Sequence, residues 1–132
     1  PFLQPLQGEV TSTYGQRRSY NNGPVGEYHG GLDLAADEGV PVAATNDGRV
    51  VFAGPLKVRG NAVIIDHGWG LYSGYYHMSA VKATAGQQVR RGETIGLVGS
   101  TGLSTGPHLH WSIWLGGNAV DPAFVLGWGL PG

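Results

Sequence analysis

Short runs in which apolar and polar residues alternate cover most of the chain and predict β-strands rather than helices. The clearest are "GLDLAA" at 31–36, "VPVAATNDGRVVFAG" at 40–54 and "NAVIIDHGWGLYSGYYHMS" at 61–79. Period-two alternation between turn residues such as glycine, asparagine and aspartate is typical of strands in antiparallel sheets. The pattern predicts one hairpin that turns at residues 46–48 and a second that turns at His67 and Gly68.

The remaining segments are short and rich in turns as well. We expect a strand at 10–14 followed by a loop up to His29, strands around Val89 and over 95–98, and a final pair within 108–120 that turns at residues 116–117. Only residues 79–85 have a sequence suited to a turn of helix. The expected fold is therefore all-β or nearly so: a small antiparallel β-sheet domain with a groove lined by loops.

Length and composition fit one domain over residues 1–132, which we expect to be a monomer. The chain has 132 residues, of which 41% are hydrophobic, and this is enough for one modest core. It starts "PFLQPLQ", without methionine or an apolar leader, and no apolar run reaches the roughly 18 residues of a membrane span. We expect a domain excised from a longer or processed chain.

The charge and cysteine content narrow the chemistry. The net charge is -1 and lysine and arginine never cluster beyond a pair, so the basic surface that binds nucleic acid is missing. The chain has no cysteine, which excludes disulfides and thiolate zinc fingers. Any metal ion would be held by histidines and carboxylates.

The segment "TGPHLHW" at 105–111 contains two histidines separated by one residue. In a strand, His108 and His110 lie on one face, roughly 6 to 7 Å apart. Ser112 and Trp114 share that face, and the residues expected on the core side are Leu109, Trp111 and Ile113. An exposed strand face carrying two imidazoles without a function would have the same pattern.

Two more histidines stand in suggestive surroundings. In "YHGGLDLAA" the paired glycines disfavour a helix, and an extended chain places His29 and Asp33 on one face, although Asp33 could simply cap a turn. In "SGYYHMS", alternation places His77 on the face of Ser73 and Tyr75, where a structural role is the alternative. His67 fits a hairpin turn and is assigned no chemistry.

Together, these side chains are of the types that zinc prefers as ligands. Imidazoles and a carboxylate, without thiolates, suit a four-coordinate ion that keeps one position open for water, as catalytic zinc sites do. Four candidate histidines are available and such a site uses two or three. Spacing alone leaves open which of them are ligands.

The runs "HGGLDLAA", "NAVIIDHGWGLYSGYYHMS" and "GQQVRRGETIGLVGSTGLSTGPHLHW" resemble, in order and separation, the lysostaphin-type zinc endopeptidases that cut peptidoglycan peptides. The resemblance extends over about residues 10–124. It implies an extracytoplasmic hydrolase with one zinc ion, whose ligands are His29, Asp33 and His110 and whose catalytic pair is His77 and His108. It also implies groove positions for Tyr14 and Arg17, and we expect Tyr75 and Trp114 to offer flat surfaces to the peptide.

Other functions remain open at this point. Some relatives are non-catalytic modules that bind the cell wall or activate another cell-wall hydrolase, and biotin- or lipoyl-carrier barrels share the short strands. A carrier needs a lysine at a hairpin tip, and neither predicted turn has one. The presence of both catalytic histidines favours an enzyme. Whether the cut bond follows a D-amino acid or lies in a glycine bridge is open.

Overall fold

A computed structural model describes residues 2, 4–6, 10–12, 17–18, 27–28, 31–101 and 106–122. The elements formed by these residues are all strands, which confirms the all-β prediction. They are β1 (Val10–Ser12), β2 (Arg17–Arg18), β3 (Glu27–Tyr28), β4 (Leu32–Ala35), β5 (Pro41–Ala43), β6 (Gly48–Leu56), β7 (Gly60–Asp66), β8 (Leu71–Val81), β9 (Gln88–Val89), β10 (Thr94–Val98), β11 (His108–Leu115) and β12 (Asn118–Val120).

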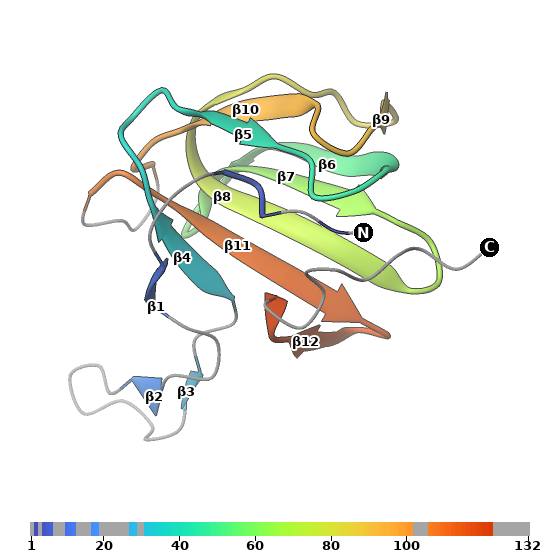
Figure 1. Cartoon of the computed structure of the whole chain (residues 1–132), viewed down its shortest axis with the longest axis horizontal. Helices are drawn as coiled ribbons and strands as arrows, with labels where there is room; N and C mark the ends of the chain where they lie inside the picture. Colours follow the sequence, from blue (N-terminus) through green and yellow to red (C-terminus); the bar gives the residue numbers. More distant parts are fainter. Residues whose placement is uncertain are drawn as a thin grey trace.

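The described strands form one ten-stranded antiparallel sheet and a separate ribbon of β2 and β3. The main path runs β1-β4-β11-β8-β7-β6-β9, with β12 paired to β11 and with β10 bridging β8 and β5. In Figure 1 the long strands β8 and β11 cross the middle of the molecule side by side, with β4 next to β11. Within the described part of the chain, no helix has the length and apolar character needed to cross a membrane.

The hairpin predicted within 61–79 is confirmed, because β7 pairs with β8 around the turn at His67. The hairpin predicted within 40–54 is wrong. Strand β5 pairs with β10, and β6 pairs with β7 through a turn at residues 57–59. In the link between β5 and β6, residues 44–46 are buried, and Ala44 exchanges backbone hydrogen bonds with Gly92 and Glu93. The link therefore leads from β5 to a strand that is not its partner, and it does not turn the chain back as a hairpin would.

The turn of helix considered at 79–85 does not form. Strand β8 continues to Val81, and Lys82 N donates a 2.8 Å hydrogen bond to Ile95 O. These residues are thus held as the partner of β10, and pairing to a neighbouring strand overrides a weak local preference for helix.

Buried apolar side chains of the described residues pack into one core cluster. The three residues predicted on the core side of β11, Leu109, Trp111 and Ile113, are buried as expected. Leu32 and Leu34 of β4 are buried in the same core. Trp111 is fully buried and is among the largest side chains of the core. Burial of a side chain of this size contributes about 2–3 kcal/mol to folding. The core thus fixes which face of β11 carries the polar side chains.

A β-bulge interrupts the alternation of β8. Asn61 pairs with Met78 and Val63 pairs with Tyr75, so two steps along β7 match three along β8. The extra residue is accommodated where His77 has a φ of 63°, in the left-handed region that non-glycine residues seldom adopt. Tyr75 and Met78 consequently face the core, while Tyr76 and His77 both lie on the opposite side, toward β11.

Candidate functional site

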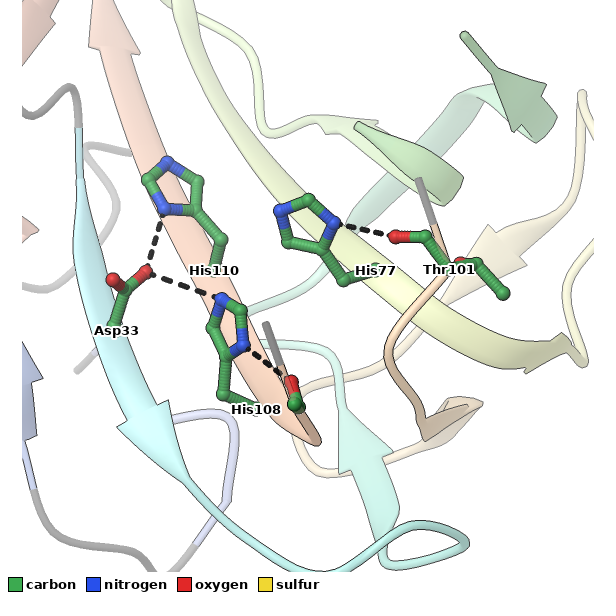
Figure 2. Close-up of polar contacts among 6 residues, drawn as sticks. Asp33, His77, Thr101, His108 and His110 are labelled. Atoms are coloured by element: carbon green, nitrogen blue, oxygen red, sulfur yellow. Dashed lines mark hydrogen bonds and ion pairs between the residues drawn. The ribbon is translucent and has the colours of Figure 1, made fainter. Parts of the chain in front are cut away.

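Strands β4 and β11 bring an aspartate and two histidines together. His110 lies opposite Asp33 in the antiparallel register, and period-two alternation places His108 on the same face as His110. The His110 Nδ1 and Asp33 Oδ1 atoms are 2.8 Å apart, and His108 Nε2 is 3.7 Å from the same oxygen. Figure 2 shows both rings directed toward this carboxylate. Residues 77 positions apart in the sequence thus form one polar cluster.

His77 joins this cluster from β8. Its ring centroid is 5.0 Å from that of His108 and 6.3 Å from that of His110. In Figure 2 the ring lies over β8, with Nδ1 turned toward Thr101 and away from the other histidines. The bulge places His77 on this face of the sheet, because a regular strand would place residue 77 on the same face as buried Tyr75.

Backbone carbonyls fix the tautomers of two of the histidines. His77 Nδ1 lies 2.7 Å from Thr101 O, and His108 Nδ1 lies 2.9 Å from Gly106 O. A carbonyl oxygen can only accept, so in each ring Nδ1–H donates, and the neutral ring carries its lone pair on Nε2. The Nε2 of His108 is the atom that lies near Asp33. Both rings therefore have an acceptor available for a proton.

The surroundings of His77 favour its neutral form. Burial lowers the pKa of His77 below its ordinary value of 6.5, and the charges of His108 and Arg59 lower it further. The hydrogen bond to Thr101 and the charge of Asp33 oppose this shift but are weaker than the effect of burial. At neutral pH the His77 ring is able to accept a proton.

Tyr76 is the neighbour of this cluster that sequence reasoning missed. Its ring centroid is 5.6 Å from that of His110 and 6.3 Å from that of Trp114. Burial raises the pKa of the Tyr76 phenol to about 12, so it is protonated at neutral pH. A Cβ at Gly74 would overlap the Tyr76 hydroxyl, so the glycine is what lets the ring lie flat across β8. Trp114 is half-buried on the predicted face of β11.

The expectation that Tyr75 contacts substrate is wrong. Its side chain is fully buried, and its hydroxyl accepts a 3.0 Å hydrogen bond from Thr45 N and lies 2.7 Å from Ser73 Oγ. Alternation along a regular strand would place Tyr75 with His77. The bulge places Tyr76 there instead, and nothing in "SGYYHMS" distinguishes the two tyrosines.

Three other residues expected at the site, Tyr14, Arg17 and His29, lie ahead of β4 in the sequence. His29 and Tyr14 lie outside the described residues, and Arg17 belongs to the short strand β2. Gly31 is buried, and a Cβ there would overlap the backbone carbonyl of Trp111. Its missing side chain allows β4 to approach β11 closely, which brings Asp33 within reach of His110.

The side chains present fit a zinc ion. Asp33 Oδ1 and His110 Nδ1 are the donor types that zinc prefers in the absence of thiolates, and they lie 2.8 Å apart. Two ligands of a tetrahedral zinc lie about 3.3 Å apart, so an adjustment of about half an ångström suffices. Among the described residues no three such side chains are already arranged around one point, and the predicted third ligand, His29, is outside them.

A small antiparallel β-domain with histidines and an aspartate on adjoining strands is the kind of framework on which hydrolytic metal sites are built. The sequence profile of Peptidase family M23 matches residues 27–122, a range that contains Asp33, His77, His108 and His110. The chain belongs to this family, and the resemblance to lysostaphin-type enzymes is confirmed.

Similar proteins agree with this assignment. The chain is 48% identical over 97 residues to the DD-carboxypeptidase/endopeptidase Mpg of Neisseria meningitidis, and 42% identical over 93 residues to the peptidoglycan DD-endopeptidase ShyA of Vibrio cholerae. These alignments cover 74% and 70% of the chain but only 22% of each relative. The catalytic domain of the antimicrobial peptidase lysostaphin from Staphylococcus simulans superposes with a TM-score of 0.80 at 31% identity, over 91% of this chain and 92% of that domain.

Proposed function

We propose that this domain is a zinc-dependent endopeptidase that hydrolyses peptide cross-links of bacterial peptidoglycan. The observation that carries the proposal is the contact of Asp33 with His110, with the rings of His77 and His108 beside it. Membership of a peptidase family and similarity to relatives named as DD-endopeptidases support the reaction and the substrate. Since peptidoglycan lies outside the cytoplasmic membrane, the proposed location is extracytoplasmic.

In this proposal His29, Asp33 and His110 hold one zinc ion. When bound, zinc supplies a Lewis acid that polarises the peptide carbonyl and makes water nucleophilic at neutral pH. Asp33 would contribute a negative charge, and the 2.8 Å separation of Asp33 Oδ1 from His110 Nδ1 places these two donor atoms side by side, so that both could hold the ion. The close approach of β4 to β11 at Gly31 sets the distance between these two side chains.

His77 and His108 act as the proton-transfer pair. Each donates Nδ1–H to a backbone carbonyl, so each neutral ring offers Nε2 as an acceptor. One ring takes the proton of the attacking water and then donates it to the leaving amine, which requires a single imidazole to alternate between its two states. A ring that has gained a proton on Nε2 also becomes a donor to the oxyanion. The carbonyls keep both rings in the required tautomer.

The experiment is digestion of purified peptidoglycan sacculi, with the released fragments identified by mass spectrometry. The domain should release free amines and carboxylates at peptide cross-links, while the His108→Ala variant, folded and zinc-loaded, should release none. A second candidate function is that of a cell-wall-binding activator of another hydrolase. Sacculi left intact by the zinc-loaded domain would contradict the endopeptidase proposal and favour the activator, whereas sacculi cut only in the glycan strands would contradict both.

A further inference from the structure

A cation lies at the edge of the histidine cluster without an assigned role. Arg59 belongs to the turn between β6 and β7, and its guanidinium carbon lies 5.0 Å from the centroid of the Tyr76 ring. The same ring is 5.6 Å from that of His110. The Arg59 side chain is half-buried, so it lies along the aromatic surface toward the site instead of extending into water.

The backbone around Arg59 is firmly held. Arg59 O accepts a 2.8 Å hydrogen bond from His77 N, which attaches the turn to the bulge of β8. The next residue, Gly60, has a φ of 71° and packs so tightly on Thr101 that a Cβ would overlap it. Asn61 N donates to Thr101 Oγ1 at 3.0 Å. The carbonyl of this same threonine accepts the Nδ1–H of His77, so Arg59 and His77 share one support.

The charge of Arg59 is not matched within the described part of the chain. No described carboxylate lies within ion-pair distance of its guanidinium, and Asp33, the carboxylate of the site, contacts His110 and His108. The charge of Arg59 is close enough to act on both His77 and Tyr76. A guanidinium placed beside imidazoles, and not paired with an acid, presents up to five donors in a planar fork that fits a carboxylate.

We infer that Arg59 is a specificity-determining residue that binds a carboxylate of the peptide substrate beside the scissile bond, and that Tyr76 holds its guanidinium in place. The inference rests on the proposed endopeptidase function and makes its substrate class narrower. A cross-link with a free carboxylate on a residue next to the cut bond can accept two hydrogen bonds from the guanidinium of Arg59. A bridge made of glycine alone offers only amides at this position. The chain is therefore specialised for carboxylate-bearing cross-links.

The test compares two synthetic cross-linked peptides that differ in one group: a free carboxylate on the residue next to the scissile bond, or its primary amide. The zinc-loaded domain should cleave the acid form with a kcat/KM about 10-fold to 100-fold higher, because a fork-to-carboxylate pair is among the stronger hydrogen bonds. In Arg59→Gln the ratio should fall to near one. Arg59→Lys keeps the charge but loses the fork, and should retain a smaller preference.

Arg49→Gln is the matched control, since Arg49 is an exposed arginine on β6 and has no ring or carboxylate contact with the described residues of the site. This variant should keep the wild-type ratio. Circular dichroism and melting temperature establish that each variant is folded. A wild-type ratio near one, or a ratio that Arg59→Gln leaves unchanged, overturns the role of Arg59. Equal losses on both peptides also overturn it and assign Arg59 to the oxyanion. If neither peptide is cut by the zinc-loaded domain, the proposed function itself fails.

Discussion

A buried chain of hydrogen bonds outside the site allows a quantitative prediction about stability. His67 Nδ1 lies 2.7 Å from Asp47 O, and His67 Nε2 lies 2.7 Å from Ser73 Oγ. Ser73 Oγ is 2.7 Å from the Tyr75 hydroxyl, which accepts a hydrogen bond from Thr45 N at 3.0 Å. This chain joins the turn between β7 and β8 to the buried link between β5 and β6.

The donor and acceptor of each hydrogen bond in this series follow from the two backbone groups at its ends, the carbonyl of Asp47 and the N–H of Thr45. Asp47 O can only accept, so neutral His67 carries its proton on Nδ1 and accepts at Nε2. Ser73 must then donate to His67 and accept from the Tyr75 hydroxyl. Ser73 is the central member, and it is fully buried. One substitution there therefore affects two neighbours.

We predict that Ser73→Ala lowers the free energy of unfolding by about 2–4 kcal/mol. The change leaves the Tyr75 hydroxyl without an acceptor and His67 Nε2 without a donor, and each orphaned buried group costs about 1–3 kcal/mol. The total is a large part of the roughly 5–15 kcal/mol that stabilises a typical domain. Urea unfolding followed by tryptophan fluorescence measures the difference.

Two further variants test the origin of this effect. Ser79→Ala, on the same strand, removes an exposed hydroxyl whose contact with Leu97 O is 3.5 Å, and should cost less than about 0.5 kcal/mol. Adding Tyr75→Phe to Ser73→Ala removes the orphaned hydroxyl, so the double variant should be more stable than the sum of the single changes predicts. A Ser73→Ala cost equal to that of Ser79→Ala, or strictly additive effects, would refute the assigned chain.

Three other predictions concern the proposed zinc ligands, Gly31 and the protonation of His67. His110→Ala should abolish both zinc binding and hydrolysis, whereas His108→Ala should keep zinc and lose only hydrolysis. Zinc content after dialysis, measured by mass spectrometry, checks this, and full zinc occupancy in His110→Ala would contradict the ligand assignment. Gly31→Ala should cost about 1–3 kcal/mol and lower the melting temperature, because its Cβ meets the Trp111 carbonyl, while Gly106→Ala, with open space around it, should change little. Burial lowers the pKa of His67 from 6.5, so below pH 6.5 the unfolded chain binds a proton there that the folded chain does not. Stability should therefore fall as pH decreases through 6.5, and a urea midpoint that is the same at pH 7.5 and pH 5.5 would argue against a neutral buried His67.

Local alternation was enough to predict the polar face of β11. His108 and His110 share one side and Trp111 is buried on the other, because this strand is regular and pairs without interruption to β4 and β8. The same reasoning failed for the segment 40–54, where the turn residues 46–48 suggested a hairpin. Turn chemistry is local, whereas the choice of β10 as the partner of β5 depends on contacts about fifty residues away in the sequence.

The bulge in β8 is the feature that no local pattern reveals, and it determines the composition of the site. The φ of 63° at His77 carries a strain on the order of 1–3 kcal/mol, which the hydrogen bonds to Arg59 O and Thr101 O offset. Because one extra residue reverses the alternation, Tyr76 and His77 both face β11 while Tyr75 enters the core. The turn that holds the strained residue also carries the Arg59 guanidinium, so one local distortion positions a proposed proton acceptor, the aromatic ring beside it and the cation on that ring.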